Sequence, residues 1–121
     1  MPKKILIVDD SQVFRELEQV LLAHRGFQLI TAEDGVEAVR KALSEAPDLI
    51  LLDVQMPVMT GRQALAILKA NPKTRDIPVV IVTTTANVHE SEQLVEAGAA
   101  TVLSKPLDSA QLLVTVRGLL G

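Results

Sequence analysis

Several short apolar runs of this sequence each end on a side chain that can contact phosphate or bind a metal ion. In chain order these side chains are Asp9, Asp10, Asp53, Thr83 and Lys105. Carboxylates are ligands that Mg²⁺ prefers, whereas a hydroxyl and an ammonium can contact phosphate oxygens. If the runs are parallel strands, their carboxyl ends meet at one edge of a sheet, where open α/β folds bind ligands. The pattern therefore predicts a phosphoryl-transfer site.

The segments between these residues predict the strands and helices that position them. Short β-branched and leucine-rich runs are typical of strands that are buried on both faces of a parallel sheet. We expect strands at residues 5–8, 28–32, 48–53, 79–83 and 102–105, each followed by a helical pattern. Strands that alternate with helices indicate a doubly wound α/β fold with right-handed crossovers.

Apolar residues at helical spacing predict which side of each helix faces the sheet. Ser11 is a suitable N-cap for the first helix, Gly26 a suitable stop, and the last helix should begin near Asp108. The residues expected to face the sheet are Phe14, Leu17 and Leu21, then Val36, Val39 and Leu43, then Leu65 and Leu68, and in the last helix Leu112, Val116, Leu119 and Leu120.

Composition limits the classes of protein to which the chain can belong. With 121 residues, 48% of them hydrophobic, we expect one domain over residues 1–121 with a substantial core. A net charge of −3 argues against nucleic acid or a membrane surface as a direct partner. There is no cysteine for a disulfide or a thiolate metal site, and no apolar stretch long enough for a signal peptide or a membrane span. We expect a soluble cytoplasmic domain.

Five segments together resemble the receiver domain of bacterial two-component response regulators, over essentially the whole chain. They read KILIVDD, AEDGVEA, DLILLDVQMPVMTG, IPVVIVTTTA and EAGAATVLSKP. Each motif alone is weak, but the ordered set is highly specific. The resemblance, which is to chemotaxis regulators among others, implies a flavodoxin-like five-stranded parallel sheet of order 2-1-3-4-5 with five flanking helices.

The resemblance also implies a role for each residue at the strand ends. Asp53 matches the phosphoacceptor, which attacks the phosphoryl group of a phosphohistidine and becomes an aspartyl phosphate. Asp9 and Asp10 match the acidic pair that holds Mg²⁺ together with Asp53 and the backbone carbonyl of Gln55. Divalent charge is needed there because an anionic carboxylate must approach an anionic phosphate.

Two further residues of the site match family positions that contact the phosphoryl group. Lys105 resembles the lysine that pairs with a phosphoryl oxygen, and Thr83 resembles the hydroxyl that turns toward the phosphate. The implied protein is a phosphorylation-activated switch rather than an enzyme, because it catalyses only its own phosphoryl transfer and dephosphorylation.

The sequence departs from the family pattern beside the site and not within it. Val102 stands where the family often has an aromatic residue, so an aromatic rotamer cannot report phosphorylation. Thr84 is larger than the usual residue at its position and would narrow access to the phosphate. Gln55 and Thr85 occupy positions that affect hydrolysis, so the sequence does not fix the lifetime of the phosphoryl group.

Three other functions fit the sequence less well. A Mg²⁺-dependent phosphatase with an aspartate nucleophile would separate its two aspartates by one residue, but Asp9 and Asp10 are adjacent and no cap insertion follows. A phosphorylation-independent, receiver-like interaction module typically lacks an acidic residue or the lysine, and this chain keeps them. A dinucleotide-binding domain needs glycine in the first βα turn, which has none.

The resemblance implies two kinds of partner. One is a sensor histidine kinase or phosphotransfer protein, and the other is an output domain or target protein that binds the last helix–strand–helix face. Between Ser109 and Gly121 the only charged residue is Arg117, and we expect Leu113 and Val114 to point away from the core. We therefore predict apolar contact of this helix with a partner, with a following domain, or with a second copy of the chain in a homodimer.

Overall fold

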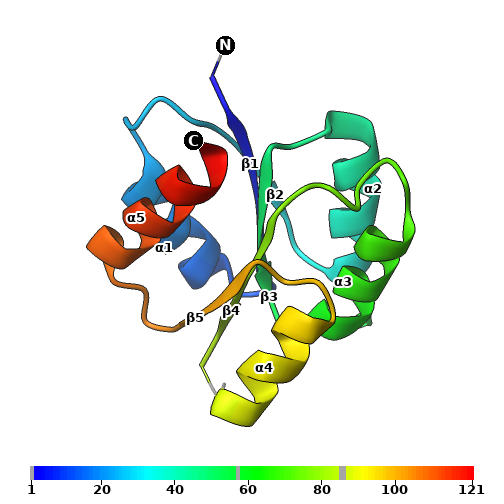
Figure 1. Cartoon of the computed structure of the whole chain (residues 1–121). Coiled ribbons are helices and arrows are strands. Elements are labelled where there is room, and N and C mark those ends of the chain that lie inside the picture. Colours follow the sequence, from blue (N-terminus) through cyan, green and yellow to red (C-terminus); the bar gives the residue numbers. More distant parts are fainter. Residues whose placement is uncertain (1, 57, 85–86) are drawn as a thin grey trace.

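The computed structural model describes residues 2–56, 58–84 and 87–121, so Thr85 lies outside the described residues. Five strands alternate with five helices along the chain (Figure 1). The strands are β1 (Lys4–Val8), β2 (Gln28–Ala32), β3 (Leu49–Asp53), β4 (Val79–Thr83) and β5 (Thr101–Ser104). The helices are α1 (Gln12–Leu22), α2 (Gly35–Glu45), α3 (Gly61–Ala70), α4 (Val88–Glu96) and α5 (Ser109–Leu120).

All strand pairs are parallel, and the order β2-β1-β3-β4-β5 confirms the predicted doubly wound, flavodoxin-like sheet. Helices α1 and α5 cover one face of the sheet, and α2, α3 and α4 cover the other (Figure 1). This arrangement follows from right-handed crossovers on both sides of the central strands. None of the described helices combines the length and the hydropathy that a transmembrane helix needs.

The two faces of the central strands fill two separate cores. Leu6 and Leu52 pack with α2 and α3, whereas Ile5 and Leu51 pack with α1 and α5. Every residue of β3 and β4 is buried, including the polar residues that end them. Polar side chains can therefore face solvent only at the strand ends, which is where the predicted site lies.

The predicted core faces of α1 and α2 are partly wrong. In α1, Leu17 is 37% exposed, and the most buried positions are Glu18 and Leu22. In α2, the buried residues are Gly35, Ala38 and Ala42, while Val36 and Leu43 are exposed. Small alanine side chains allow α2 to pack closely on the sheet and on α3, so the larger residues lie at the edges of the contact. Leu65 and Leu68 of α3 are buried as predicted.

Helix α5 also differs in part from its prediction. Leu112 and Val116 are fully buried, and Leu120 packs against the same core. Leu113, which we expected to point outward, is half-buried against that core, whereas Leu119 is exposed. Val114 is 73% exposed, as predicted. The outer face of α5 is therefore less apolar than the sequence indicated, and Val114 is its main apolar feature.

The start of α3 lies directly against the end of β3, which leaves no space for a side chain at Gly61. Its backbone N–H donates to the Val54 carbonyl oxygen at 2.9 Å. An added Cβ would lie 2.3 Å from the Asp53 carbonyl oxygen and 2.6 Å from the Val54 Cα, and backbone atoms cannot give way as a flexible side chain can. We expect Gly61→Ala to lower the free energy of unfolding by roughly 2 kcal/mol, measured by urea denaturation.

Gly118 in α5 provides the matched control. An added Cβ there would meet no atom within 4 Å, so Gly118→Ala should raise the free energy of unfolding by up to about 1 kcal/mol through helix propensity. Equal effects of the two substitutions would contradict the packing argument.

Candidate functional site

The parallel strands bring the predicted site residues to one edge of the sheet. Val8 pairs with Leu52, and Asp53 pairs with Val82, so β1, β3 and β4 end at similar heights. The chain after β5 is tied to β4 by a hydrogen bond from the Lys105 backbone N–H to the Thr83 carbonyl oxygen at 2.8 Å. The side chains that meet there are those of Asp9, Asp10, Asp53 and Lys105, with Thr83 buried at the end of β4.

Three carboxylates form a group that suits a hard divalent cation. One oxygen from each of Asp9, Asp10 and Asp53 lies within 4.8 Å of the other two. Ligands around Mg²⁺ sit about 2.1 Å from the ion and hence roughly 3–4 Å from each other, so small side-chain movements would complete the set. Asp9 and Asp53 are buried while Asp10 is exposed, which leaves one side open to water ligands and phosphate. The donor set therefore fits Mg²⁺.

Lys105 provides the positive charge within this group. Its Nζ lies 2.5 Å from Asp9 Oδ2 and 3.6 Å from Asp53 Oδ2, and its side chain is only 5% exposed. The same atom lies 4.2 Å from the centroid of the Phe14 ring, where cation–π attraction helps to hold it. One ammonium thus faces two buried carboxylates, and the third carboxylate lies beside them.

Backbone N–H groups orient the carboxylates of Asp9 and Asp53. The Ser11 N–H donates to Asp9 Oδ1 at 2.9 Å, and Arg15 Nη1 donates to the Asp9 carbonyl oxygen at 2.7 Å. Ser11 also caps α1 by accepting from the Phe14 N–H at 3.4 Å, as predicted. The Gln55 N–H donates to Asp53 Oδ1 at 3.2 Å. Asp53 therefore keeps its second oxygen, Oδ2, on the side of Lys105.

Burial and like charge make Asp53 an unusually weak acid. Removal from water, and next the charge of Asp9, raise the pKa of Asp53 to about 6, with a smaller contribution from Asp10. The Lys105 ammonium and the Gln55 N–H oppose this rise in pKa but do not cancel it. A divalent cation between the carboxylates would favour the ionised, nucleophilic form.

Glu18 is a buried carboxyl that the sequence analysis missed. It is 2% exposed, and burial, followed by the charge of Asp9, raises its pKa to about 8. Its position one turn after Phe14 and one turn before Leu22 was visible in the sequence. Charged residues in helices usually face solvent, so the position of Glu18 in the sequence does not by itself predict its burial.

Comparison with known proteins identifies the family. A family model described as the response regulator receiver domain matches residues 5–117. This chain is a member of that family. The polar-differentiation response regulator DivK of Brucella anthropi is 33% identical over 121 residues, 100% of this chain and 98% of DivK. The response regulator PleD of Caulobacter vibrioides is 40% identical over 119 residues, 98% of this chain but only 26% of PleD.

Solved structures agree with this assignment. The chemotaxis protein CheY4 of Vibrio cholerae superposes with a TM-score of 0.91 at 32% identity, over 98% of this chain and 99% of CheY4. The receiver domain of the sensor histidine kinase PA1611 from Pseudomonas aeruginosa PAO1 also gives 0.91, at 29% identity over 100% of this chain and 99% of that domain. That structure has a magnesium ion coordinated in its active-site cleft. The present chain is thus a phosphoacceptor switch of two-component signalling.

The raised pKa of Asp53 predicts how the stability of the receiver domain depends on pH. The folded state holds this proton more tightly than the unfolded chain, so the contribution of Asp53 is full below about pH 4 and is lost as pH rises through about 6. In metal-free buffer near pH 8, Asp53→Asn should therefore raise the free energy of unfolding by about 1–3 kcal/mol. Near pH 4 the difference from wild type should be small.

Urea denaturation in the presence of a chelator measures this difference. Asp76 is an exposed acid away from the site, so Asp76→Asn should change the stability little at either pH. A loss of more than about 1 kcal/mol in Asp53→Asn near pH 8 would show that the carboxylates do not repel one another.

Proposed function

We propose that this receiver domain accepts a phosphoryl group on Asp53 from the phosphohistidine of a sensor histidine kinase or a phosphotransfer protein. Mg²⁺ would be held by Asp9, Asp10, Asp53 and the backbone carbonyl of Gln55. The observation that supports this best is the position of Asp53 Oδ2. It lies 3.6 Å from the Lys105 ammonium, at a buried strand end, within a group of three carboxylates.

The transfer is an in-line displacement at phosphorus. An Asp53 oxygen forms a bond to phosphorus while the phosphorus–nitrogen bond breaks, and the electron pair and a proton go to the histidine nitrogen. Mg²⁺ held by these carboxylates would offset the charge of the phosphoryl oxygens. Lys105 binds one phosphoryl oxygen, and the Thr83 hydroxyl turns toward another. Attack by water later releases inorganic phosphate, so the domain has no turnover on a separate substrate.

A phosphorylation-independent interaction module is the alternative function. Burial, and then the like charge of Asp9, raises the pKa of Asp53 and costs folding free energy, and such a module would gain no function from that cost. All the described groups that phosphoryl transfer needs are present and converge at one sheet edge. The arrangement therefore favours the phosphoacceptor.

We expect acetyl phosphate and Mg²⁺ to add one phosphoryl group, labile to hydroxylamine, because an activated donor can replace the kinase. Intact-protein mass spectrometry would measure it. Asp53→Ala should abolish the addition, and so should chelation of Mg²⁺, because nucleophile and cation are both required.

The matched control is Asp76→Ala, which removes an exposed carboxylate outside the site and should be labelled like wild type. Stable labelling of Asp53→Ala would refute the assignment of the phosphoacceptor.

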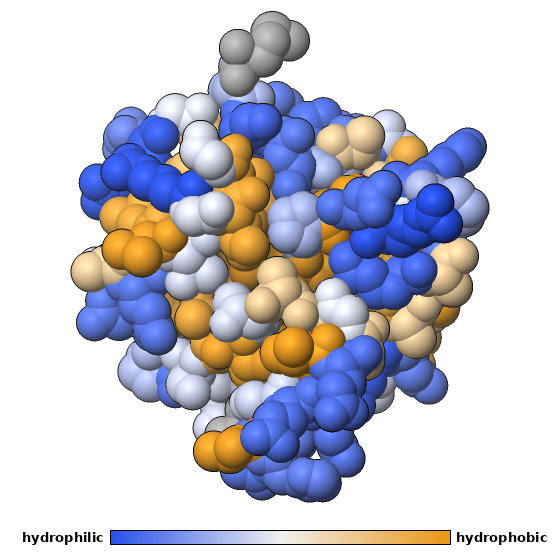
Figure 2. All heavy atoms as spheres, in the orientation of Figure 1, coloured by the Kyte–Doolittle hydropathy of each residue, from blue (hydrophilic) through white to orange (hydrophobic). Residues whose placement is uncertain are grey.

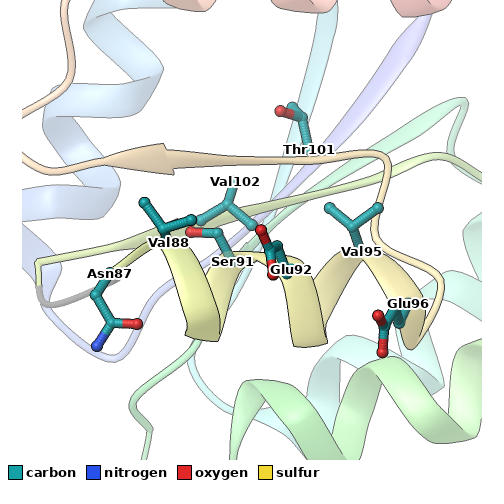
Figure 3. A pocket seen from close by; sticks show the side chains of 8 residues that line it. All are labelled: Asn87, Val88, Ser91, Glu92, Val95, Glu96, Thr101 and Val102. Carbon is teal, nitrogen blue, oxygen red and sulfur yellow. The ribbon is translucent and has the colours of Figure 1, made fainter.

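The output surface lies on α4, β5 and α5. A groove of about 580 Å³ runs between α4 and β5 (Figure 3). Val88 is 75% and Val95 is 49% exposed at its edge, and Figure 2 shows hydrophobic surface beside the hydrophilic side chains of α4. Its lining residues are Asn87, Val88, Ser91, Glu92, Val95, Glu96, Thr101 and Val102. This apolar surface supports a target protein, an output domain or a second copy of the chain as partner.

The homodimer can be tested at Val114, the most exposed large apolar residue of α5. If phosphorylation drives dimerisation through this face, beryllofluoride with Mg²⁺ should raise the sedimentation coefficient of wild type. Val114→Glu should abolish the increase, because a carboxylate cannot be buried unpaired in an apolar contact.

Val20 on α1, which is 70% exposed, supplies the control, and Val20→Glu should behave as wild type. Monomers in every sample would exclude the homodimer and leave a different protein as the partner.

A further inference from the structure

Glu18 is a buried carboxyl that the phosphoryl-transfer mechanism does not use. It lies in α1 on the side that faces the sheet and is 2% exposed. Its Oε2 is buried and has no hydrogen-bond partner among the described residues. A buried carboxyl oxygen without a donor costs free energy, so this residue calls for a functional explanation.

Glu18 lies on the same face of α1 as Phe14, whose ring contacts Lys105. Phe14 lies one turn before Glu18 on α1, and its ring contacts the Lys105 ammonium at 4.2 Å. The charges of Asp9, Lys105 and Asp53 all act on Glu18. Phe14 and Glu18 thus share one face of α1, and this face contacts the ammonium through Phe14.

Among the described hydrogen bonds, the Lys105 ammonium has unused N–H donors and Glu18 has an oxygen without a donor. A lysine ammonium has three N–H donors, and Lys105 Nζ makes one described hydrogen bond, to Asp9 Oδ2. Asp53 Oδ2, at 3.6 Å, is too far for a second. Glu18 Oε2 is an acceptor without a donor. Because the lysine side chain is flexible, its ammonium can move between the acceptors around it.

We propose that Glu18 is a positioning residue whose carboxylate competes with the phosphoryl group on Asp53 for the Lys105 ammonium. The inference rests on the proposed role of Asp53. Ionised Glu18 draws the ammonium toward α1 and weakens phosphoryl binding. Neutral Glu18 leaves the ammonium free to bind the phosphoryl oxygen.

The charge state of Glu18 sets the pH range of this competition. Burial, then the charge of Asp9, raises its pKa to about 8, with Lys105 opposing and Asp53 adding to the rise. The nearby Arg15 is occupied by the Asp9 carbonyl oxygen and by Glu33. Helix α5, on the same face of the sheet, carries Asp108 at its N-cap and Arg117, and neither acts on Glu18. Mg²⁺ offsets the charges of Asp9 and Asp53 and so lowers the pKa of Glu18, and competition should strengthen as pH rises from about 6 to about 9.

Beryllofluoride with Mg²⁺ is the probe of phosphoryl binding, and calorimetry measures its dissociation constant because the chain lacks tryptophan and tyrosine. Glu18→Gln keeps the shape of the side chain but cannot ionise. We compare the dissociation constant of wild type with that of Glu18→Gln as a ratio. The pH dependence of beryllofluoride itself is the same for both proteins and therefore drops out of this ratio. We expect this ratio to be near one at about pH 6 and to reach roughly tenfold at about pH 9, or about 1.4 kcal/mol.

Action through Lys105 is tested by repeating the comparison in a Lys105→Ala background, where the ratio should stay near one at both pH values. Glu18→Met, a second uncharged variant, should match Glu18→Gln, and Glu16→Gln, at an exposed position of α1, should match wild type. A ratio that does not change with pH, or the same change without Lys105, would overturn the inference.

Failure of the proposed function gives a different result. If wild type and Asp53→Asn bind the probe equally, or wild type does not bind it, the roles proposed for Asp53 and for Glu18 are both excluded. If wild type binds through Asp53 and the Glu18 ratio is flat, only the role of Glu18 is excluded.

Discussion

The contact of one buried ammonium with two buried carboxylates is the interaction on which this structure depends. Lys105 reaches Asp9 and Asp53 from a third strand end, so β1, β3 and β5 must all be parallel and end at one edge. The cost of burying these charges requires a rigid apolar support, which the fully buried strands β3 and β4 provide. The sheet order and the apolar strands thus hold this small group of charged side chains in position.

This group is incomplete without additional positive charge. Asp9, Asp10 and Asp53 carry three carboxylates against the single ammonium of Lys105, and Glu18 adds a fourth acid behind them. Burial, and then this imbalance of charge, raises the pKa values of Asp53 and Glu18. If Asp53 accepts a phosphoryl group as proposed, a divalent cation would stabilise the ionised carboxylates and the incoming phosphoryl group would compete for Lys105. Relief of the repulsion among the carboxylates would then couple the proposed phosphorylation to a change in structure.

The sequence was sufficient for the fold because each strand is an unbroken apolar run that ends on a polar residue. It was less reliable for the helices, where apolar spacing of three or four residues leaves the rotational phase open. In α2 the alanines face the sheet and the larger Val36 and Leu43 do not, since close packing selects small side chains. In α1 the predicted sheet-facing side is rotated from the observed one, so the apolar spacing did not predict the burial of Glu18. The distances from Lys105 to its partners, and the groove beside α4, depend on tertiary packing that no local pattern encodes.

The path from the site to the output surface is also constrained by the described residues. Thr83 ends β4 and pairs with Ser104 of β5, and β5 contributes Thr101 and Val102 to the groove. The Lys105 N–H is bonded to the Thr83 carbonyl oxygen, so the ammonium and the hydroxyl lie on adjoining strand ends. Val102 has no aromatic ring to rotate, so the described connection between the site and the groove consists of these paired strand ends and α4. A shift of β5 against α4 would change the width of the groove directly. The lack of an aromatic residue at Val102 therefore excludes an aromatic rotamer as the relay and leaves Thr83 and the paired ends of β4 and β5 as the described link between the site and the groove.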